Sequence, residues 1–441
     1  MGAEAFAEPV VIDLGSGHGA LEGGYDRSWR STVPRWFTPV LLAVLLLISS
    51  SASAAPVRPP FTSLLRIPLG PADPYLITAT GRLLTQTNGQ ITAYDLGSGA
   101  LRWQAGRSTP VYRLRTGHGL VLMQPWTTSG AADGTTAIST ATGARVWDNP
   151  RSVITIAGSD VLLAVTGTRS LSGTNRRVQG LIEVLDPANG VPRWQVRVPS
   201  TAVVLGVPGP AGNGARMLMV RDDRTARLFD LTDGREMNVR DLPAANYGPE
   251  NPVVSGGVVL LRHPGPSGME VSAYDPATLR ELWTKPADGT FEVRPCGVLA
   301  CFLGQDGVHA VEPATGDLRW QRPGWQSVTE RGSALLAYPD TDISRPVGLV
   351  DSATGRVLVG LRGWLPLAGA NSSGELLVTR EVPPGARTMV AVADQESGRL
   401  RPIAVLPAGT GDCEAAPGRL VCRSTTGELV VWAYDEAAGV G

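Results

Sequence analysis

The 441-residue chain contains few of the residue types from which most active sites are built. It has four histidines, four cysteines and a single lysine, Lys285, and charged residues make up 18% of the sequence. With so few histidines, the chain has few candidates for the base of a hydrolytic triad or for the ligands of a histidine metal cluster. The formal net charge of -1 supplies no basic surface for nucleic acid or another polyanion. We therefore expect no nucleic-acid partner, and no catalytic or metal-binding residue is predicted.

The four cysteines fall into two pairs that are close in sequence, Cys296 with Cys301 and Cys413 with Cys422. In each pair the first cysteine ends one expected strand and the second lies on the next, and antiparallel neighbours can place two Cα atoms within disulfide reach. We predict both bridges, which would indicate an oxidising compartment. Structural zinc sites use closer spacings than these. Free thiols or a metal site remain as alternatives.

Only one long apolar run is present, from residue 36 to residue 48, and small residues extend it to about the 20 that span a bilayer. Arg27, Arg30 and Arg35 precede it, so the positive-inside rule predicts a disordered cytoplasmic tail over 1–35 and a transmembrane helix or signal anchor over 36–55. Residues 61–441 would then be exported. The alternative is a signal peptide cleaved near Ala54, which would leave a secreted protein.

Glycine and proline are plentiful, at 53 and 35 residues, and they punctuate a segment that the chain repeats. Each copy has a short apolar strand, an acidic residue, a glycine four positions later and, in several copies, a tryptophan four positions after that. The copies recur at roughly 40 residues, which is the length of one four-stranded propeller blade. Aligned on the acidic position, the copies fall at Asp95, Ser139, Asp186, Asp230, Asp275, Glu312, Asp351, Asp394 and Asp435.

The residues of each copy predict a strand, a tight turn and a second strand. Aspartate can hydrogen-bond the backbone of its own turn, and glycine adopts a positive φ without steric cost. The tryptophan on the outgoing strand is expected to wedge between neighbouring sheets, as a core residue and not a ligand contact. The signature positions of the repeat are Asp95, Gly99, Trp103, Trp147, Asp186, Gly190, Trp194, Asp275, Trp283, Glu312, Gly316 and Trp320.

The pattern Ala-x-Asp-x-x-x-Gly-x-x-x-Trp, intact at 93–103 and nearly so at 310–320, resembles the tryptophan-docking repeat of PQQ-like (pyrroloquinoline-quinone-like) β-propellers. The resemblance covers about 61–441 and implies an all-β ring of four-stranded, WD40-like blades. That family includes quinone-dependent alcohol dehydrogenases and also the BamB-like assembly lipoproteins of bacterial outer membranes. The repeat is specific for architecture, and it says little about activity.

Nine hairpins can be counted, whereas eight blades are usual for the family that the chain resembles. We therefore expect eight blades, with nine as the alternative, because several copies lack the tryptophan and one of them could be irregular. The last copy ends without room for its outer strand, and Ser63–Pro68 resembles such a strand. This segment is expected to complete the final blade and close the ring.

The leading functional hypothesis is a non-enzymatic, membrane-anchored envelope protein whose propeller binds an unknown protein or ligand. The alternatives are an extracytoplasmic PQQ-dependent dehydrogenase and a ligand-binding sensor. For quinone-dependent members the resemblance implies a disulfide between adjacent cysteines, together with a calcium site, and this chain has no adjacent cysteines. No cofactor is therefore predicted. Longer loops such as Thr168–Gly180 and Tyr338–Pro346 are where we expect a partner to be met.

Overall fold

The computed structural model describes Val40 and most of residues 61–434. The segments not described are 1–39, 41–60, 107–111, 128–129, 132–133, 157–160, 166–167, 170–175, 209–214, 222, 246–250, 340–341, 370–374, 384–386 and 435–441. The chain divides into two compact units, 1–58 and 59–441. The predicted tail 1–35 and, apart from Val40, the predicted span 36–55 lie outside the described residues. Among the described residues, no helix has the length and hydrophobicity needed to span a bilayer.

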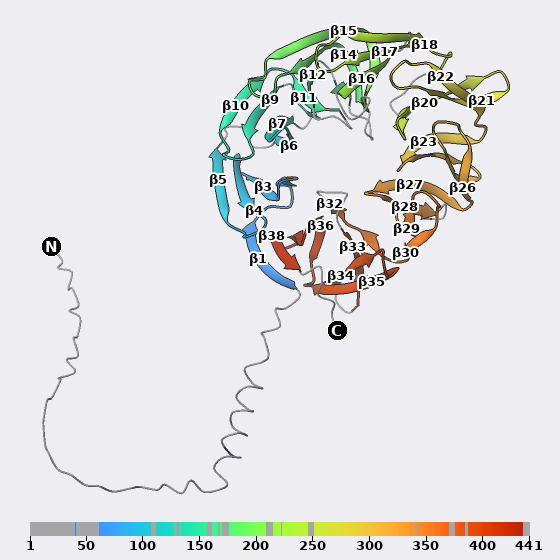
Figure 1. Cartoon of the computed structure of the whole chain (residues 1–441). Coiled ribbons are helices and arrows are strands. Elements are labelled where there is room, and N and C mark those ends of the chain that lie inside the picture. Colours follow the sequence, from blue (N-terminus) through green and yellow to red (C-terminus); the bar gives the residue numbers. More distant parts are fainter. Residues whose placement is uncertain are drawn as a thin grey trace, which may run out of the picture. The chain divides into compact units, whose positions relative to one another are not determined.

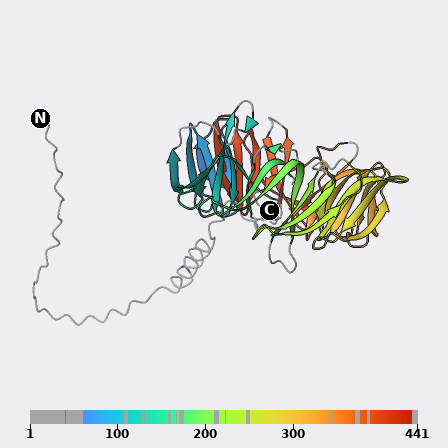
Figure 2. The same ribbon diagram turned by 90° about the horizontal axis from the view of Figure 1, so that it is seen from above.

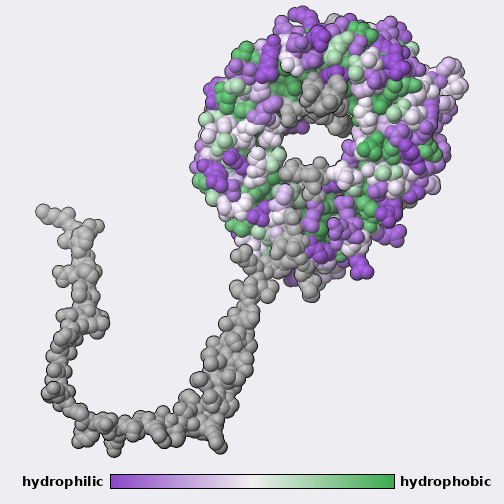
Figure 3. Space-filling view, in the orientation of Figure 1, coloured by the Kyte–Doolittle hydropathy of each residue, from purple (hydrophilic) through white to green (hydrophobic). Residues whose placement is uncertain are grey.

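The second unit is an all-β ring of sheets around a central opening, as Figures 1 and 3 show. Viewed from above in Figure 2, the strands of each blade lie side by side. In the described part of the chain the strands form nine blades, because eight sheets are present and the eight-stranded one contains two blades that share β15. Our preference for eight blades is therefore corrected to nine.

The first five blades contain the following strands. Blade 1 has β2 (Tyr75–Ile77), β3 (Arg82–Thr87), β4 (Gln90–Asp95) and β5 (Leu101–Gly106). Blade 2 has β6 (Tyr112–Gly117), β7 (Leu120–Thr127), the short β8 (Gly130–Ala131), β9 (Thr135–Ser139) and β10 (Arg145–Asn149). Blade 3 has β11 (Ser152–Thr155), β12 (Leu162–Val165), the short β13 (Thr168–Arg169), β14 (Arg176–Leu185) and the first half of β15 (Pro192–Pro208). Blade 4 has the rest of β15, β16 (Ala215–Arg221), β17 (Thr225–Asp230) and β18 (Glu236–Asp241). Blade 5 has β19 (Pro252–Ser255), β20 (Val258–Gly265), β21 (Gly268–Tyr274) and β22 (Glu281–Pro286).

The last four blades continue around the ring. Blade 6 has β23 (Thr290–Cys296), β24 (Leu299–Gly304), β25 (Gly307–Val311) and β26 (Leu318–Arg322). Blade 7 has β27 (Trp325–Arg331), β28 (Ala334–Pro339), β29 (Gly348–Asp351) and β30 (Val357–Gly360). Blade 8 has β31 (Leu365–Pro366), β33 (Leu376–Val382), β34 (Arg387–Asp394) and β35 (Arg399–Leu406), and β32 (Ala368–Gly369) follows β31. Blade 9 has β36 (Thr410–Ala416), β37 (Arg419–Ser424), β38 (Glu428–Tyr434) and β1 (Phe61–Pro68).

Each blade is an antiparallel meander, so its connections lie at two opposite ends. One end has the turns between first and second strands and those between third and fourth strands, including the Asp-x-x-x-Gly turns; we call this side of the ring the turn face. The other end has the loops between second and third strands and the connections between blades, and we call it the loop face. The expected loop Thr168–Gly180 contains β13 and the first half of β14, and like Tyr338–Pro346 it connects the second strand of a blade to the third. Both of these loops therefore belong to the loop face.

The ring closes through its two chain ends, as the sequence predicted. β1 pairs antiparallel with β38, with Phe61 opposite Tyr434 and Pro68 opposite Glu428. The first segment of the propeller is thereby the outermost strand of its last blade, and no open edge is left at that position. The ring of phenylalanine Phe61 also stacks on Trp432 with their centroids 5.7 Å apart.

Two departures from the regular blade could not be foreseen from the repeat. β15 runs without interruption from the outer edge of blade 3 to the first strand of blade 4, and β14 pairs with both of its halves, from Pro192 to Val204. Between blades 8 and 9, β32 pairs in parallel with β36. Backbone hydrogen bonds therefore link neighbouring blades at these two joints, in addition to side-chain packing.

The hydrophobic core is distributed between the blades. Nine clusters of buried apolar residues are present in the described part of the chain, one at each joint of the ring. The joint between blades 9 and 1 contains Ile67, Leu83 and Val431, for example, and that between blades 7 and 8 contains Leu336, Trp364 and Val378. Each blade is thus stabilised mainly by its two neighbours, as in other repeat proteins.

Candidate functional site

The five tryptophans of the repeat make the same contact at five joints of the ring, between blades 1 and 2, 2 and 3, 3 and 4, 5 and 6, and 6 and 7. Each indole Nε1 donates a hydrogen bond to a backbone carbonyl of the next blade, and the acceptor is always the residue directly after that blade's acidic position. The pairs are Trp103 to Thr140 at 2.9 Å, Trp147 to Pro187 at 2.9 Å, Trp194 to Leu231 at 3.0 Å, Trp283 to Pro313 at 2.8 Å and Trp320 to Ser352 at 3.0 Å. The indoles therefore connect blades.

The acidic residue shapes the turn between the third and fourth strands of its own blade. The Oδ1 atom of Asp95 accepts hydrogen bonds from the amide and the hydroxyl of Ser98, at 2.9 and 2.8 Å. Its Oδ2 atom pairs with the Arg102 guanidinium at 2.8 Å. The bond from Arg102 and those from Ser98 hold the pKa of the Asp95 carboxyl well below its usual range. Glu312 makes the equivalent ion pair with Arg319 at 2.9 Å.

The glycine of the turn is required by the indole that packs on it. Gly190 has a φ of +71°, and a Cβ atom placed there would lie 2.7 Å from the Cδ2 atom of Trp147. Gly316 stands in the same relation to Trp283, at 3.0 Å from Cε2. The acid, the glycine and the tryptophan of the sequence pattern thus form one interlocking joint. Its tryptophan comes from one copy of the repeat, and its acid and glycine come from the next.

The joint between blades 4 and 5 lacks both halves of this arrangement. Asn238 occupies the tryptophan position of blade 4, directly opposite Leu228, and its amide donates to the carbonyl of Ala277 at 2.7 Å. The glycine position of the next turn is Leu279, which has a positive φ of 54°. Because no indole packs against this turn, a side chain is sterically tolerated there, at the cost of a left-handed backbone.

Both predicted disulfides are present, and no described cysteine is free. Cys296 joins Cys301 across β23 and β24, and Cys413 joins Cys422 across β36 and β37. Each bridge therefore links the first and second strands of its blade. Cys413 lies directly opposite Cys422 in blade 9, whereas in blade 6 the residue opposite Cys301 is Arg294 and the bridge runs diagonally to Cys296. Cys296 and Cys301 are fully buried, whereas Cys413 is partly exposed.

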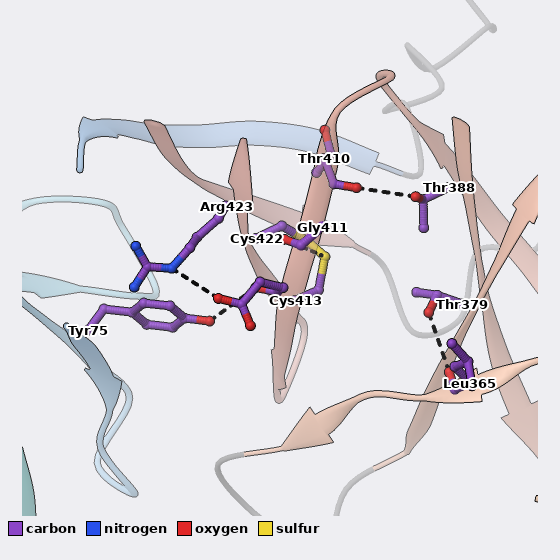
Figure 4. Close-up of a disulfide and its surroundings, with 10 residues drawn as sticks. Tyr75, Leu365, Thr379, Thr388, Thr410, Gly411, Cys413, Cys422 and Arg423 are labelled. Atoms are coloured by element: carbon purple, nitrogen blue, oxygen red, sulfur yellow. Dashed lines mark hydrogen bonds and ion pairs between the residues drawn. A yellow bond between two sulfur atoms is a disulfide. The ribbon is translucent and has the colours of Figure 1, made fainter. Parts of the chain in front are cut away.

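The second bridge packs in the cluster between blades 8 and 9, and the seam where blade 9 meets blade 1 lies on the other side of the same sheet (Figure 4). Arg423 ties the two blades together, because its guanidinium donates to the carbonyls of Gly70 and Asp73 and also to the carboxylate of Asp412 at 3.0 Å. The Tyr75 hydroxyl of blade 1 donates to the carbonyl of Asp412 at 3.2 Å. All three nitrogens of Arg423 are thus used within the ring, and we interpret this seam as structural.

Burial is the main cause of the shifted pKa values of two side chains at this seam, Glu414 and Tyr75. It raises the pKa of the Glu414 carboxyl, and the negative charge of nearby Asp412 raises it further. The pKa of the Tyr75 phenol is also raised, chiefly by burial and then by the charges of Glu414 and Asp412. The Arg423 guanidinium, which pairs with Asp412, opposes this rise at Glu414 and lies 4.9 Å from the centroid of the Tyr75 ring.

The residues do not match the quinone site that the resemblance implies for dehydrogenases. The two disulfides join cysteines five and nine positions apart, so neither is the adjacent-cysteine bridge of such a site. Among the described residues, no three or more His, Cys, Asp or Glu side chains gather into a group that could hold a metal ion. His263 is buried and bonded to the Ser272 hydroxyl at 2.7 Å, within the core of blade 5.

A family model described as outer membrane protein assembly factor BamB matches residues 132–241 and 178–439. The chain belongs to this family. Its PQQ-like propeller is similar to BamB from Moraxella catarrhalis, with 19% identity, a TM-score of 0.36, and coverage of 63% of this chain and 81% of that one. It is also similar to the quinohemoprotein alcohol dehydrogenase from Comamonas testosteroni, with 12% identity, a TM-score of 0.37, and coverage of 85% and 76%. No curated protein sequence matches the chain.

Some of the residues that hold the ring together were missed at the sequence level. Asn238 and Leu279 could have been found, because a copy without tryptophan precedes a turn without glycine. Arg419 and Arg423, which bind backbone carbonyls of blade 1, carry no such signal. Their partners lie more than 300 positions away in the sequence, and only the closed ring brings them together.

Proposed function

We propose that this protein is a non-enzymatic scaffold of the cell envelope, anchored in the membrane and displaying its propeller outside the cytoplasm to bind another protein. The observation that carries the proposal is membership of the family described as outer membrane protein assembly factor BamB. The structure is consistent with it, since the signature residues of the repeat serve contacts between blades. In this proposal the loops of the propeller bind the partner protein.

Two features support an extracytoplasmic location. Both disulfides join strands of the folded propeller, and such bridges persist in oxidising compartments. Residues 36–55 are long and apolar enough to span a bilayer, with Arg27, Arg30 and Arg35 on the side that the positive-inside rule keeps in the cytoplasm. In this proposal residues 1–35 remain in the cytoplasm and 36–55 is retained as a single-pass anchor.

The loop face is the side that we propose meets the partner. The loop between β28 and β29 belongs to it and exposes Ile343 at 66% of its surface. The turn face, in contrast, carries the turns at the acidic positions, and five of these turns already accept a hydrogen bond from the indole of the preceding blade. A partner on the loop face would not compete with the contacts that hold the ring together.

The test is crosslinking in intact cells, followed by solubilisation and affinity capture of the tagged full-length chain. We expect one or a few envelope proteins to be recovered reproducibly. Substituting Ile343→Asp should reduce the recovery, whereas Val357→Asp, at an exposed apolar position of the outer strand β30, should leave it unchanged. Failure to recover any reproducible partner from intact cells would refute the scaffold proposal.

Topology and processing need separate measurements. Protease added to intact spheroplasts should digest the propeller and spare an epitope placed within residues 1–35. The amino-terminal sequence of the mature protein should include residues before 54. A mature chain that begins near Ala55 would instead indicate a cleaved signal peptide and a secreted propeller.

A further inference from the structure

Three arginines and one tryptophan gather on the loop face of blade 8. Trp364 lies on the connection from blade 7, two residues after Arg362, Arg380 is near the end of β33, and Arg387 begins β34. β33 and β34 are antiparallel and pair Val382 with Arg387, which places Arg380 and Arg387 on the same side of the sheet. We call these three arginines, with Trp364, the arginine patch.

The side of the sheet that carries Arg380 is the one that faces blade 7. Leu376 and Val378 precede Arg380 at every second position of β33, and both are buried in the cluster between blades 7 and 8. Met389, directly opposite Arg380 on β34, packs against the same cluster. Arg380 therefore stands where the apolar joint between the two blades reaches the solvent.

Arg380 is held in place by an aromatic ring and not by an acid. Its guanidinium carbon lies 4.7 Å from the centroid of the Trp364 ring, and Trp364 itself is only 6% exposed. An arginine stacked on an aromatic face loses side-chain freedom but keeps its in-plane N–H donors available. Such a preorganised guanidinium is suited to bidentate binding of a carboxylate.

Among the described residues, the arginines of the patch have no acidic partner. Arg362, Arg380 and Arg387 are all exposed, and in the described part of the chain none of them forms an ion pair or a side-chain hydrogen bond. Nearby on the same face, Arg345 is paired with Asp342 at 3.8 Å. Other surface arginines of the propeller, such as Arg102 and Arg319, also have an acidic partner.

We propose that the arginine patch is a docking site for an acidic peptide segment of a partner protein, with a carboxylate bound by Arg380. This inference rests on the proposed scaffold function and adds the chemistry of the partner. The rim next to the patch is aromatic and aliphatic, with Tyr338 at the edge of the blade 7–8 cluster and Ile343 exposed on the adjacent loop. Three cations on a molecule of net charge -1 match a short run of carboxylates, whereas a polyphosphate needs a longer basic surface.

The test uses the full-length chain in detergent and a fluorescein-labelled octapeptide of alternating glutamate and alanine. Fluorescence anisotropy should show binding that weakens with added salt, and no binding of the matching glutamine and alanine peptide. Arg380→Gln and Arg387→Gln should each weaken binding roughly tenfold, as expected for the loss of a charge-assisted hydrogen bond. Arg380→Lys should also weaken it, because a lysine keeps the charge but cannot stack and bind bidentately.

Arg356→Gln is the matched control, since Arg356 is exposed and lies in a third-to-fourth-strand turn on the opposite, turn face. The proposal is overturned if the glutamate peptide fails to bind at millimolar concentration, or if Arg356→Gln weakens binding as much as Arg380→Gln does. It is also overturned if anionic phospholipid vesicles bind in an Arg380-dependent way while the peptide does not. Retained capture of a partner from cells by the Arg380→Gln variant would refute the patch and leave the scaffold function intact.

Discussion

Gly190→Ala is the sharpest test of the joint between tryptophan and turn. Gly190 has a φ of +71°, and an alanine there must hold a left-handed backbone, at a cost of about 1–2 kcal/mol. Its Cβ would also lie 2.7 Å from the Cδ2 atom of Trp147. Overpacking of this kind costs about 1–3 kcal/mol more, because the indole or the turn must shift. We expect the free energy of unfolding to fall by about 2–5 kcal/mol in total.

The chain offers a matched control for the backbone term. Gly81 has nearly the same φ, +73°, but a Cβ there would meet nothing within 4 Å. Gly81→Ala should therefore lose only about 1–2 kcal/mol. The difference between the two variants isolates the contact with the indole.

The free energy of unfolding of both variants is measured by guanidinium denaturation, with circular dichroism and tryptophan fluorescence as the signals. The slope of free energy against denaturant should stay unchanged, so that the shift in midpoint reports stability. Shortening the indole by Trp147→Val in the Gly190→Ala background should be less damaging than in the wild type, with a coupling of about 1 kcal/mol or more. Equal losses for Gly190→Ala and Gly81→Ala, or strict additivity in the double variant, would refute the interlocking joint.

The remaining predictions concern the second disulfide and the acidic turns. The Cys413–Cys422 bridge should be reduced by dithiothreitol before the fully buried bridge of blade 6, since Cys413 is partly exposed; mass spectrometry after alkylation gives the order, and the reverse order would contradict the burial argument. Replacing both of its cysteines by serine should cost about 2–3 kcal/mol of stability, as expected for a short closed loop, and an unchanged denaturation midpoint would count against this. The lowered pKa of Asp95 implies stability that is present above the unfolded pKa of about 4 and is lost as the pH falls towards the lower folded value. Asp95→Asn should therefore destabilise at pH 7 and flatten the decline between pH 5 and pH 2 in denaturant midpoints, and a variant with an unaltered pH profile would contradict it.

Local features of the fold were predictable from sequence because their partners are close in the chain. The turn from Asp95 to Gly99 is closed by a hydrogen bond between those two residues, Gly99 N to Asp95 O at 2.7 Å. The two disulfides likewise join neighbouring strands of one hairpin. The closing strand was recognisable because Ser63–Pro68 has the composition of an outer strand that the last copy lacks.

The number of blades was predicted wrongly: eight were expected from the sequence, with nine as the alternative, and the structure has nine. Copies without tryptophan still form complete blades, because other apolar residues, such as Val359 and Leu361 between blades 7 and 8, fill the joint. The presence of an indole therefore does not decide whether a copy becomes a blade. How many blades fit in the ring depends on the angle at every joint, and that angle is set by packing between sheets.

The amino-acid sequence by itself determined the repeating strand–turn–strand unit, the two disulfide pairs and the strand that closes the ring, because each depends on short-range contacts or on a repeated pattern. The tertiary structure alone decided the count of nine blades, the continuous β15 and the arginine patch. Arg380 lies 16 positions after Trp364, on the second strand of blade 8, and no periodicity in the sequence specifies their contact. Contacts between separate strands become definite only when the sheets pack.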